Sequence, residues 1–405
     1  MKRILIFGVQ LMAALLLYAS PLEDFLGNKA VNAAATAVFI QDLQTGKVLV
    51  EHNRDASLLP ASIMKTVTIA SLLREKGAQE RFHTMIYADG PIKDGAIDGD
   101  LLVSGGGDPT LGANCQPESA DIADELIASL RSRGVSSVEG ALRVDTSLYT
   151  GPACPPSWVR EDRAESYGTG SHALNFRRNA SGGRAVKDPV SVFTTYLSNR
   201  LSDAGIKVHG GISVGNEGLS DAGEATVLVD HVSDVYAEVM RSCMMRSDNL
   251  FAENLLRTFA LARGKEGSTA DGAAEMMNYW SHNGVPVKGV SIVDGSGLSR
   301  SNRVTARFIG SILKQMGDDE DYSTFMPLAG QEGTLSDFLK DTALDSYVAM
   351  KTGSMRGIQC YAGYKLDEQF APTHSIVIIM NGIGTRSQAR HAAERLLLEV
   401  FPENK

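Results

Sequence analysis

The sequence lacks the spacings by which metal and nucleic-acid sites are usually recognised. Its four cysteines include no Cys-x-x-Cys pair and its eight histidines show no His-x-x-x-His spacing, so no metal site and no cofactor is expected. Basic residues form no patch, and tyrosine and phenylalanine are not interleaved with arginine, which excludes nucleic acid as an expected partner. Repeats and low-complexity segments are absent as well, in a chain of 405 residues with a formal charge of -9.

Long apolar runs are also scarce, and the N-terminus carries one of moderate length. Met-Lys-Arg precedes an apolar stretch, residues 4–19, which is short for a membrane span and has the flank of a secretory signal. Residues 31–33 offer a cleavage site, so residues 1–33 are predicted to be a signal peptide, and residues 17–19 are a second, less good site. The alternative is an uncleaved anchor with peripheral membrane association. Either way, we expect export to the periplasm or cell envelope.

The few cysteines divide into two kinds. Cys115 and Cys154 lie in loop-like sequence of one region, and export to an oxidising compartment makes a disulfide between them one of two open alternatives. On the chain-entropy model such a bridge stabilises by at most about 4 kcal/mol. Cys243 and Cys360 have apolar neighbours, which predicts buried free thiols.

Three short motifs follow one another along the chain, and the first contains Ser62 and Lys65. They stand three residues apart after Pro60, at the start of a run without glycine or proline, residues 62–76. This pattern predicts a helix with both side chains on one face. A serine becomes a nucleophile when a base takes its proton, and a lysine is such a base when desolvation lowers its pKa.

The second motif is Ser247, Asp248 and Asn249, between two helical runs. A second hydroxyl here can relay a proton to a leaving group, and a side-chain amide can hold a substrate carbonyl. By itself the motif is equally typical of a turn.

The third motif is Lys351, Thr352 and Gly353, followed by Ser354, at the end of a strand-like segment, residues 346–351. Strand-like segments at 358–365 and 375–380 follow, which predicts an antiparallel meander. Gly353 lets a peptide backbone lie against the strand edge, and Lys351 and Thr352 can bind a carboxylate. Together the ordered motifs predict an active-site serine peptidase of the penicillin-binding kind.

The spacing of the motifs predicts the organisation of the chain. Ser247 follows Ser62 by far more residues than a helix connection needs, so a separate, mostly-β module of one or two subdomains is inserted, residues 83–233, with one helix at about 119–133. Residues 34–82 and 234–405 are predicted to form the catalytic domain, an antiparallel sheet flanked by helices. With 43% hydrophobic residues the chain can bury a core of that size.

Beyond the motifs, the chain resembles the class C low-molecular-mass penicillin-binding proteins, the D-Ala-D-Ala carboxypeptidase/endopeptidases, from about residue 38 to 395. The resemblance includes Gly-Asp-Leu-Leu-Val-Ser-Gly-Gly-Gly-Asp-Pro-Thr-Leu at 99–111, Ala-Leu-Asn-Phe at 173–176, and Asp-Gly-Ser-Gly-Leu-Ser-Arg at 294–300. It implies an α+β (α/β) fold of the penicillin-binding/β-lactamase-like transpeptidase type. Peptidoglycan stem peptides and β-lactam antibiotics are the partners it implies.

The resemblance also implies roles for single residues. Ser62 would attack the carbonyl between two D-alanines with Lys65 as general base, and the backbone N–H groups of Ser62 and Ser354 would form the oxyanion hole. Arg300 would bind the carboxylate of the diamino-acid side chain. The remaining implied roles are proton relay by Ser247 and Lys351, binding of the acyl side by Asn249, binding of the terminal carboxylate by Lys351 and Thr352, and a contribution from Asp145 and Tyr149 of the insert. No role is assigned to Arg356.

Three other hypotheses compete with this one. Ser213 stands in a Gly-x-Ser-x-Gly pattern, but the loop-like sequence after it does not supply the helix that a nucleophile elbow needs. A β-lactamase would need a deacylating glutamate that the spacing after the second motif does not offer. A peptidoglycan-binding protein without turnover is disfavoured by the complete motif set. The sequence leaves open the choice between carboxypeptidase and endopeptidase, and the oligomeric state.

Overall fold

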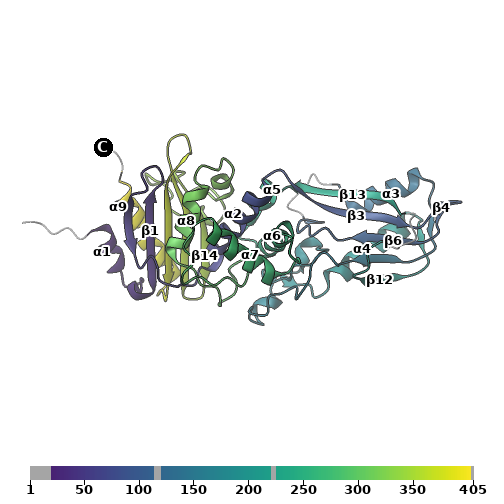
Figure 1. Ribbon diagram of the computed structural model, residues 1–405, viewed down its shortest axis with the longest axis horizontal. Helices are drawn as coiled ribbons and strands as arrows, with labels where there is room; N and C mark the ends of the chain where they lie inside the picture. The colour runs from purple at the N-terminus through teal and green to yellow at the C-terminus, as the bar shows by residue number, and fades with distance from the viewer. Residues whose placement is uncertain (1–19, 114–119, 220–224, 403–405) are drawn as a thin grey trace, which may run out of the picture.

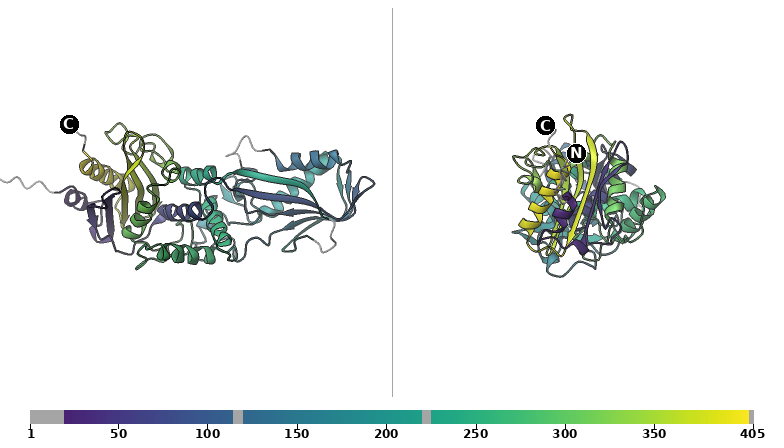
Figure 2. Two further views of the ribbon diagram at one scale, coloured as in Figure 1. Left: turned by 45° about the horizontal axis from the view of Figure 1, so that its top comes forward. Right: turned by 90° about the vertical axis from the view of Figure 1, so that its left-hand side faces the viewer.

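The computed structural model describes residues 20–113, 120–219 and 225–402. The molecule is elongated, with a helix-covered sheet at one end and the long strands of the insert at the other (Figure 1; Figure 2, left).

A five-stranded antiparallel sheet forms the first lobe, with the strand order β14-β15-β16-β1-β2. Its strands are β1 (Thr36–Asp42), β2 (Val48–His52), β14 (Val348–Met355), β15 (Ile358–Leu366) and β16 (Pro372–Asn381). The meander expected from the sequence is therefore present. The Lys-Thr-Gly motif, however, lies inside β14 rather than after it, because β14 continues to Met355 before it turns into β15.

Alternating side chains of this sheet bury two separate cores. On one face, Phe39, Ala349 and Ile379 belong to a core to which five helices contribute. These are α2 (Met64–Lys76), α5 (Tyr236–Arg246), α6 (Asn249–Ala262), α7 (Thr269–His282) and α8 (Ala306–Met316). On the other face, Val38 and Met350 pack against α1 (Pro21–Leu26) and α9 (Arg386–Val400). Edge strand β14 thus lies next to both helical layers.

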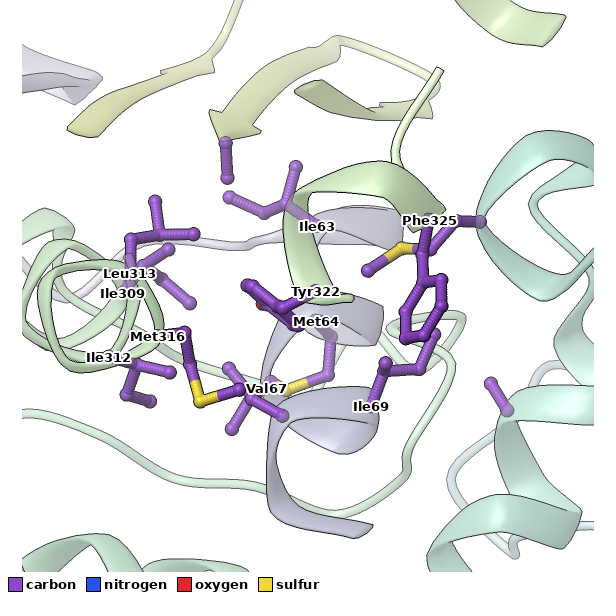
Figure 3. Packing of buried hydrophobic residues seen from close by; sticks show 14 of the residues in the cluster. Ile63, Met64, Val67, Ile69, Ile309, Ile312, Leu313, Met316, Tyr322 and Phe325 are labelled. Atoms are coloured by element: carbon purple, nitrogen blue, oxygen red, sulfur yellow. The ribbon is translucent and has the colours of Figure 1, made fainter. Parts of the chain in front are cut away.

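Helix α2 runs through the centre of the larger core. Every residue from Met64 to Leu73 is buried, and Met64 and Val67 lie in one cluster with Ile309 and Tyr322 (Figure 3). The predicted helix over 62–76 is divided in two, because Ser62 lies in a 3-10 turn, η2 (Ala61–Ile63), that precedes α2. A helix buried on all sides is held in place by its surroundings, which fixes the position of Lys65.

The insert forms the second lobe with its own core. Its main sheet is mixed, with the order β12-β8-β6-β3-β13. The strands are β3 (Arg81–Asp89), β6 (Asp100–Ser104), β8 (Leu142–Asp145), β12 (Ile212–Gly215) and β13 (Ala225–Val235). Smaller sheets are built from β4 (Ile92–Lys93), β5 (Ala96–Ile97), β7 (Ser137–Val138) and β11 (Lys207–Val208), and from β9 (Ala180–Ser181) and β10 (Arg184–Ala185).

Within its described residues, the insert has two helices that cover its sheet, whereas the sequence predicted one. The expected helix is α3 (Ile122–Ser132), and the second is α4 (Pro189–Asp203). Asp188 caps α4, and Val190, Phe193 and Leu197 lie on its buried side. A capping residue is followed here by a proline and then by apolar residues spaced three and four apart. This pattern indicates a helix, and the sequence prediction did not include it.

The N-terminal described segment belongs to the first lobe, although the predicted signal peptide includes it. Ser20 caps α1 through a reciprocal bond with Glu23, and Phe25 and Val31 are buried in the core beneath α9. Cleavage after Ala33 removes these contacts, whereas cleavage at the second predicted site, after Ala19, keeps them. In the part of the chain that the structure describes, no helix combines the length and apolarity that crossing a membrane requires.

The packing of Phe25 makes a stability prediction. Phe25→Ala deletes a ring that is 3% exposed, so we expect the free energy of unfolding to fall by about 3–5 kcal/mol. Leu49→Ala, at a side chain that is 42% exposed, is the control and should change it by less than about 0.5 kcal/mol. Urea unfolding of the purified protein, beginning at Ser20, measures both. Equal stability of the Phe25→Ala variant and the wild type would show that this segment is not part of the folded enzyme.

Candidate active site

The structure brings the first motif together as the sequence predicts. Lys65 Nζ lies 3.1 Å from Ser62 Oγ. Ser62 stands on the turn that leads into α2, and Lys65 in the first turn of that helix. Gly353 of β14 packs directly against this turn, since a Cβ at Gly353 would meet Pro60 O at 2.7 Å and Ser62 N at 3.1 Å. Glycine is needed at this position for the strand to approach the nucleophile, and any larger residue would push the two apart.

Lys65 has three oxygen partners. Besides Ser62 Oγ, its Nζ lies 2.7 Å from Asn249 Oδ1 and 2.7 Å from Ser296 O. These two carbonyl oxygens can only accept, so they take two N–H groups and leave the third direction for Ser62. Burial lowers the pKa of Lys65, while nearby acidic groups oppose the effect. A neutral amine would therefore aim its lone pair at the Ser62 hydroxyl, as a general base requires.

The second motif joins α5 to α6. Ser247 adopts a left-handed conformation with φ 56° and lines the same cavity as Ser62. Asp248 caps α6 by accepting from Phe251 N, and its carboxylate pairs with Arg178 of the insert. Asn249 donates through Nδ2 to Tyr167 O at 2.8 Å. The amide is thus held between the insert and Lys65.

The third motif contributes a second buried lysine. Lys351 Nζ lies 2.7 Å from Thr352 O, and its pKa is lowered well below the ordinary value by burial and then by the charge of Lys65. Two ammonium groups buried side by side repel each other, which favours a neutral form of at least one of the two lysines. Thr352 Oγ1 bonds to Thr334 Oγ1 at 2.8 Å, and Ser354 Oγ to Gln359 Oε1 at 2.6 Å.

A cavity of about 400 Å³ joins the three motifs. Ser62, Ser247 and Thr352 all open into it. It is lined by Ser62, Ser247, Thr334, Leu335, Phe338, Thr352, Ser354, Gln359, Tyr361, Arg386 and Arg390. The nucleophile, a second hydroxyl and the strand edge therefore face one space large enough for a small peptide.

The remaining predicted site residues lie apart from this cavity. Arg300 and Arg356 are exposed, and Arg356 sits in the turn between β14 and β15. Asp145 is buried at the end of β8, where it accepts from Ser147 N. The Tyr149 hydroxyl lies 3.2 Å from Thr258 Oγ1 of α6, and burial raises its pKa to about 12. None of these four lines the cavity within the described ranges.

The cysteines are free thiols wherever the structure describes them. Cys115 lies outside the described residues, and Cys154 is a free thiol. Cys243 and Cys360 are buried free thiols, as the sequence indicates, and burial raises the pKa of each to about 12.

Two buried carboxylates hold the segment that contacts Lys65, and the sequence reading assigned neither a role. Asp294 accepts from Gly297 N, Ser299 N, Asn302 Nδ2 and Trp158 Nε1, at 2.6–2.8 Å. Glu253 Oε1 accepts from Gly295 N at 3.0 Å and Ser296 N at 2.9 Å. Ser296 O, the acceptor for Lys65, is thereby fixed. The signal was available, since Glu253 is an acid inside an apolar run four residues after Asn249.

Glu253 makes a prediction about pH. Burial, and then the charge of Asp294, raise the pKa of Glu253 above its usual 4.5, so the folded state holds this proton in a range where the unfolded state has released it. Stability should therefore fall as pH rises from about 5 to about 8. Glu253→Gln removes this titration, and the variant should gain stability relative to the wild type over that range. A stability difference between the two proteins that is the same at both pH values would contradict the assignment.

Comparison with known protein families agrees with the site. The family model described as "D-Ala-D-Ala carboxypeptidase 3 (S13) family" matches residues 18–182 and 177–399. A D-alanyl-D-alanine carboxypeptidase from Actinomadura sp. (strain R39) is 26% identical, with 85% of this chain and 77% of the relative covered. The carboxypeptidase DacB of Mycolicibacterium smegmatis is 29% identical, with 81% and 72% covered.

Solved structures show the same fold. Penicillin binding protein 4 (dacB) from Haemophilus influenzae matches with a TM-score of 0.81 at 21% identity, covering 94% of this chain and 98% of that one. A predatory peptidoglycan endopeptidase from Bdellovibrio bacteriovorus matches with a TM-score of 0.60 at 17% identity, covering 91% and 92%. The family that the motifs suggested is thus confirmed: the chain belongs to the D-Ala-D-Ala carboxypeptidase 3 (S13) family and is a hydrolase acting on D-Ala-D-Ala.

Proposed function

We propose that the protein is a periplasmic enzyme that cleaves after D-alanine in peptidoglycan stem peptides through an acyl-enzyme on Ser62. The observation that carries this proposal is the contact of Ser62 Oγ with a buried lysine whose other two partners are carbonyl oxygens. That arrangement supplies the base that a serine nucleophile needs.

In the acylation step, Ser62 Oγ attacks the carbonyl carbon between the two D-alanines and passes its proton to Lys65. The backbone N–H groups of Ser62 and Ser354 bind the oxygen that becomes negative. The close packing of Gly353 against the Ser62 turn supports this role, because it brings β14 next to the nucleophile. Collapse of the tetrahedral intermediate breaks the C–N bond.

The leaving amine needs a proton, and Ser247 and Lys351 are the proposed relay. Ser247 opens into the cavity, and burial and the charge of Lys65 hold the pKa of Lys351 well below its ordinary value, so this lysine gives up a proton more readily than a solvated one. Lys351 and Thr352 bind the carboxylate of the leaving D-alanine. Water then attacks the Ser62 ester and releases the shortened peptide.

On the acyl side, Asn249 is the proposed ligand of the substrate amide, and Arg300 of the diamino-acid carboxylate. Arg300 is exposed at the end of the segment that Glu253 and Asp294 hold in place, which supports an accessible binding role. For Asp145 and Tyr149 the contacts support a different contribution. Tyr149 secures the insert to α6 through Thr258, and with it the segment that carries Tyr167 to Asn249.

A β-lactamase is the second candidate, and its requirement is a glutamate that activates the deacylating water. Glu253, the acid hydrogen-bonded to the Lys65 segment, is fully buried and its Oε1 already accepts two backbone N–H groups. This position does not suit activation of solvent, so we expect the penicillin ester on Ser62 to persist.

We further propose that the chain is exported and that the leader is cleaved after Ala19. The basic and apolar N-terminus and the peptidoglycan substrates of the proposed reaction support export. The capped helix α1 and the burial of Phe25 support retention of residues from Ser20 onward.

The proposal is tested by intact mass after incubation with benzylpenicillin, together with release of D-alanine from a stem pentapeptide. The wild type should gain one penicillin adduct and release D-alanine. Ser62→Ala should gain no adduct and lose turnover, on the scale of about 10⁶ seen when a serine nucleophile is removed. Ser213→Ala, in the Gly-x-Ser-x-Gly pattern, is the matched control and should behave as the wild type. Turnover that survives Ser62→Ala would end the proposal.

A further inference from the structure

We infer that Arg386 and Arg390, in the first two turns of α9, form a second carboxylate-binding subsite on the leaving-group side of the cavity. This subsite would favour cross-linked peptides, whose leaving group is a whole stem, over peptides that release a single D-alanine. The inference rests on the proposed function, since it extends the cavity at Ser62.

The two arginines share the cavity with the nucleophile. Both line the 400 Å³ space into which Ser62 and Ser247 open, and they are the only charged residues among its described lining. The side chains of Thr352 and Tyr361 stand opposite each other on neighbouring strands β14 and β15, on the sheet face that α9 covers. Helix α9 therefore brings its first turns to the edge where the proposed carboxylate site begins.

The cavity lies on the side of the leaving group. Its lining includes Ser247 and Thr352, the groups proposed to serve the leaving amine and its carboxylate. Asn249 and Arg300, proposed to bind the acyl side, do not line it. A substrate bound along β14 would thus extend its leaving portion toward α9.

Arg390 is held in a fixed orientation. Its Nε lies 3.1 Å from Glu394 Oε1, one helical turn away, and its guanidinium lies over the Phe338 ring at 5.8 Å. Glu394 also accepts from Leu339 N at 3.1 Å, which fixes the carboxylate in turn. An arginine held through Nε keeps its terminal N–H groups free for a ligand, and a fixed guanidinium pairs bidentately with a carboxylate.

Arg386 is exposed, and among the described residues no carboxylate pairs with it. It lies at the first position of α9, where the helix dipole also favours an anion. Arg386, and the terminal N–H groups of Arg390 that Glu394 does not occupy, are therefore available to an anion that enters the cavity.

Space continues beyond the arginines. Arg386 and Arg390 also line a second cavity of about 820 Å³ between α9 and the segment from Asp337 to Thr342. Besides the two arginines, its charged lining includes Lys340 and Arg395 together with Asp337 and Glu394, and so is positive on balance. A single D-alanine leaves this second cavity empty, whereas a stem peptide reaches it.

The chemistry of the two leaving groups differs in the number of carboxylates. D-alanine carries one, which Lys351 and Thr352 are proposed to hold. The stem released from a cross-link carries that carboxylate and at least one more along its chain. Arginine is the side chain best suited to bind such a further carboxylate at a fixed distance from the first.

The test compares kcat/KM on a stem pentapeptide with kcat/KM on a cross-linked dimer, for the wild type, Arg386→Gln, Arg390→Gln and the double variant. We expect the double variant to lose about 10- to 100-fold on the dimer, the scale of hydrogen bonds to a charged group, and at least about 10-fold less on the pentapeptide. Arg307→Gln is the control, because Arg307 pairs with Asp55 and packs on the opposite face of the sheet; it should lower neither rate.

A second measurement uses a dimer in which the further carboxylates of the leaving stem are amidated, while the carboxylate next to the scissile amide, proposed to bind Lys351 and Thr352, is left free. The wild type should lose its preference for this substrate, and the double variant should lose nothing further. Equal losses on pentapeptide and dimer, or an unchanged effect after amidation, would overturn the subsite. Absence of both penicillin adduct and D-alanine release in the wild type would instead overturn the proposed function, so the two failures are distinguishable.

Discussion

At the centre of the first lobe, the amine of Lys65 forms hydrogen bonds with three separate parts of the chain, and the site depends on these contacts. Ser62 comes from the turn before α2, Asn249 from α6, and Ser296 O from the segment that follows α7. A lysine buried this completely is costly when charged. The surrounding structure offsets the cost with two fixed carbonyl acceptors, and the same two contacts direct the amine toward the nucleophile.

Behind Lys65 stands a layer of buried carboxylates and a contact from the insert. Glu253 fixes Ser296, Asp294 fixes the following loop, and the insert reaches both Asn249 and Asp294 through Tyr167 and Trp158. Two segments of the insert therefore form hydrogen bonds directly with residues that position the base. Substitutions in the insert can therefore change how Lys65 is positioned against Ser62 through these hydrogen bonds.

The sequence predicted the parts of this site that short motifs encode, and it failed where packing decides. Ser62, Lys65, Ser247 and Lys351 converge as the motif order implies, because each motif sets its own local geometry. The close packing of Gly353 on the Ser62 turn is a tertiary contact that the motif does not encode, and it stands beside the predicted role of this glycine at the strand edge. Helix α4 and the buried Glu253 each have a local sequence pattern from which they could have been predicted. The contact of Tyr167 O with Asn249 left no signal, since a backbone carbonyl from a distant loop carries no residue preference.

The most direct test of the account is the rate of Ser62 acylation by benzylpenicillin as a function of pH, followed by intact mass. If neutral Lys65 is the base, the rate should rise with pH and level off with a midpoint below 10.5, since burial lowers the pKa of this lysine and only its deprotonated form can accept the proton. A rate that is independent of pH, or that falls as pH rises, would contradict the role of Lys65 and with it the central claim.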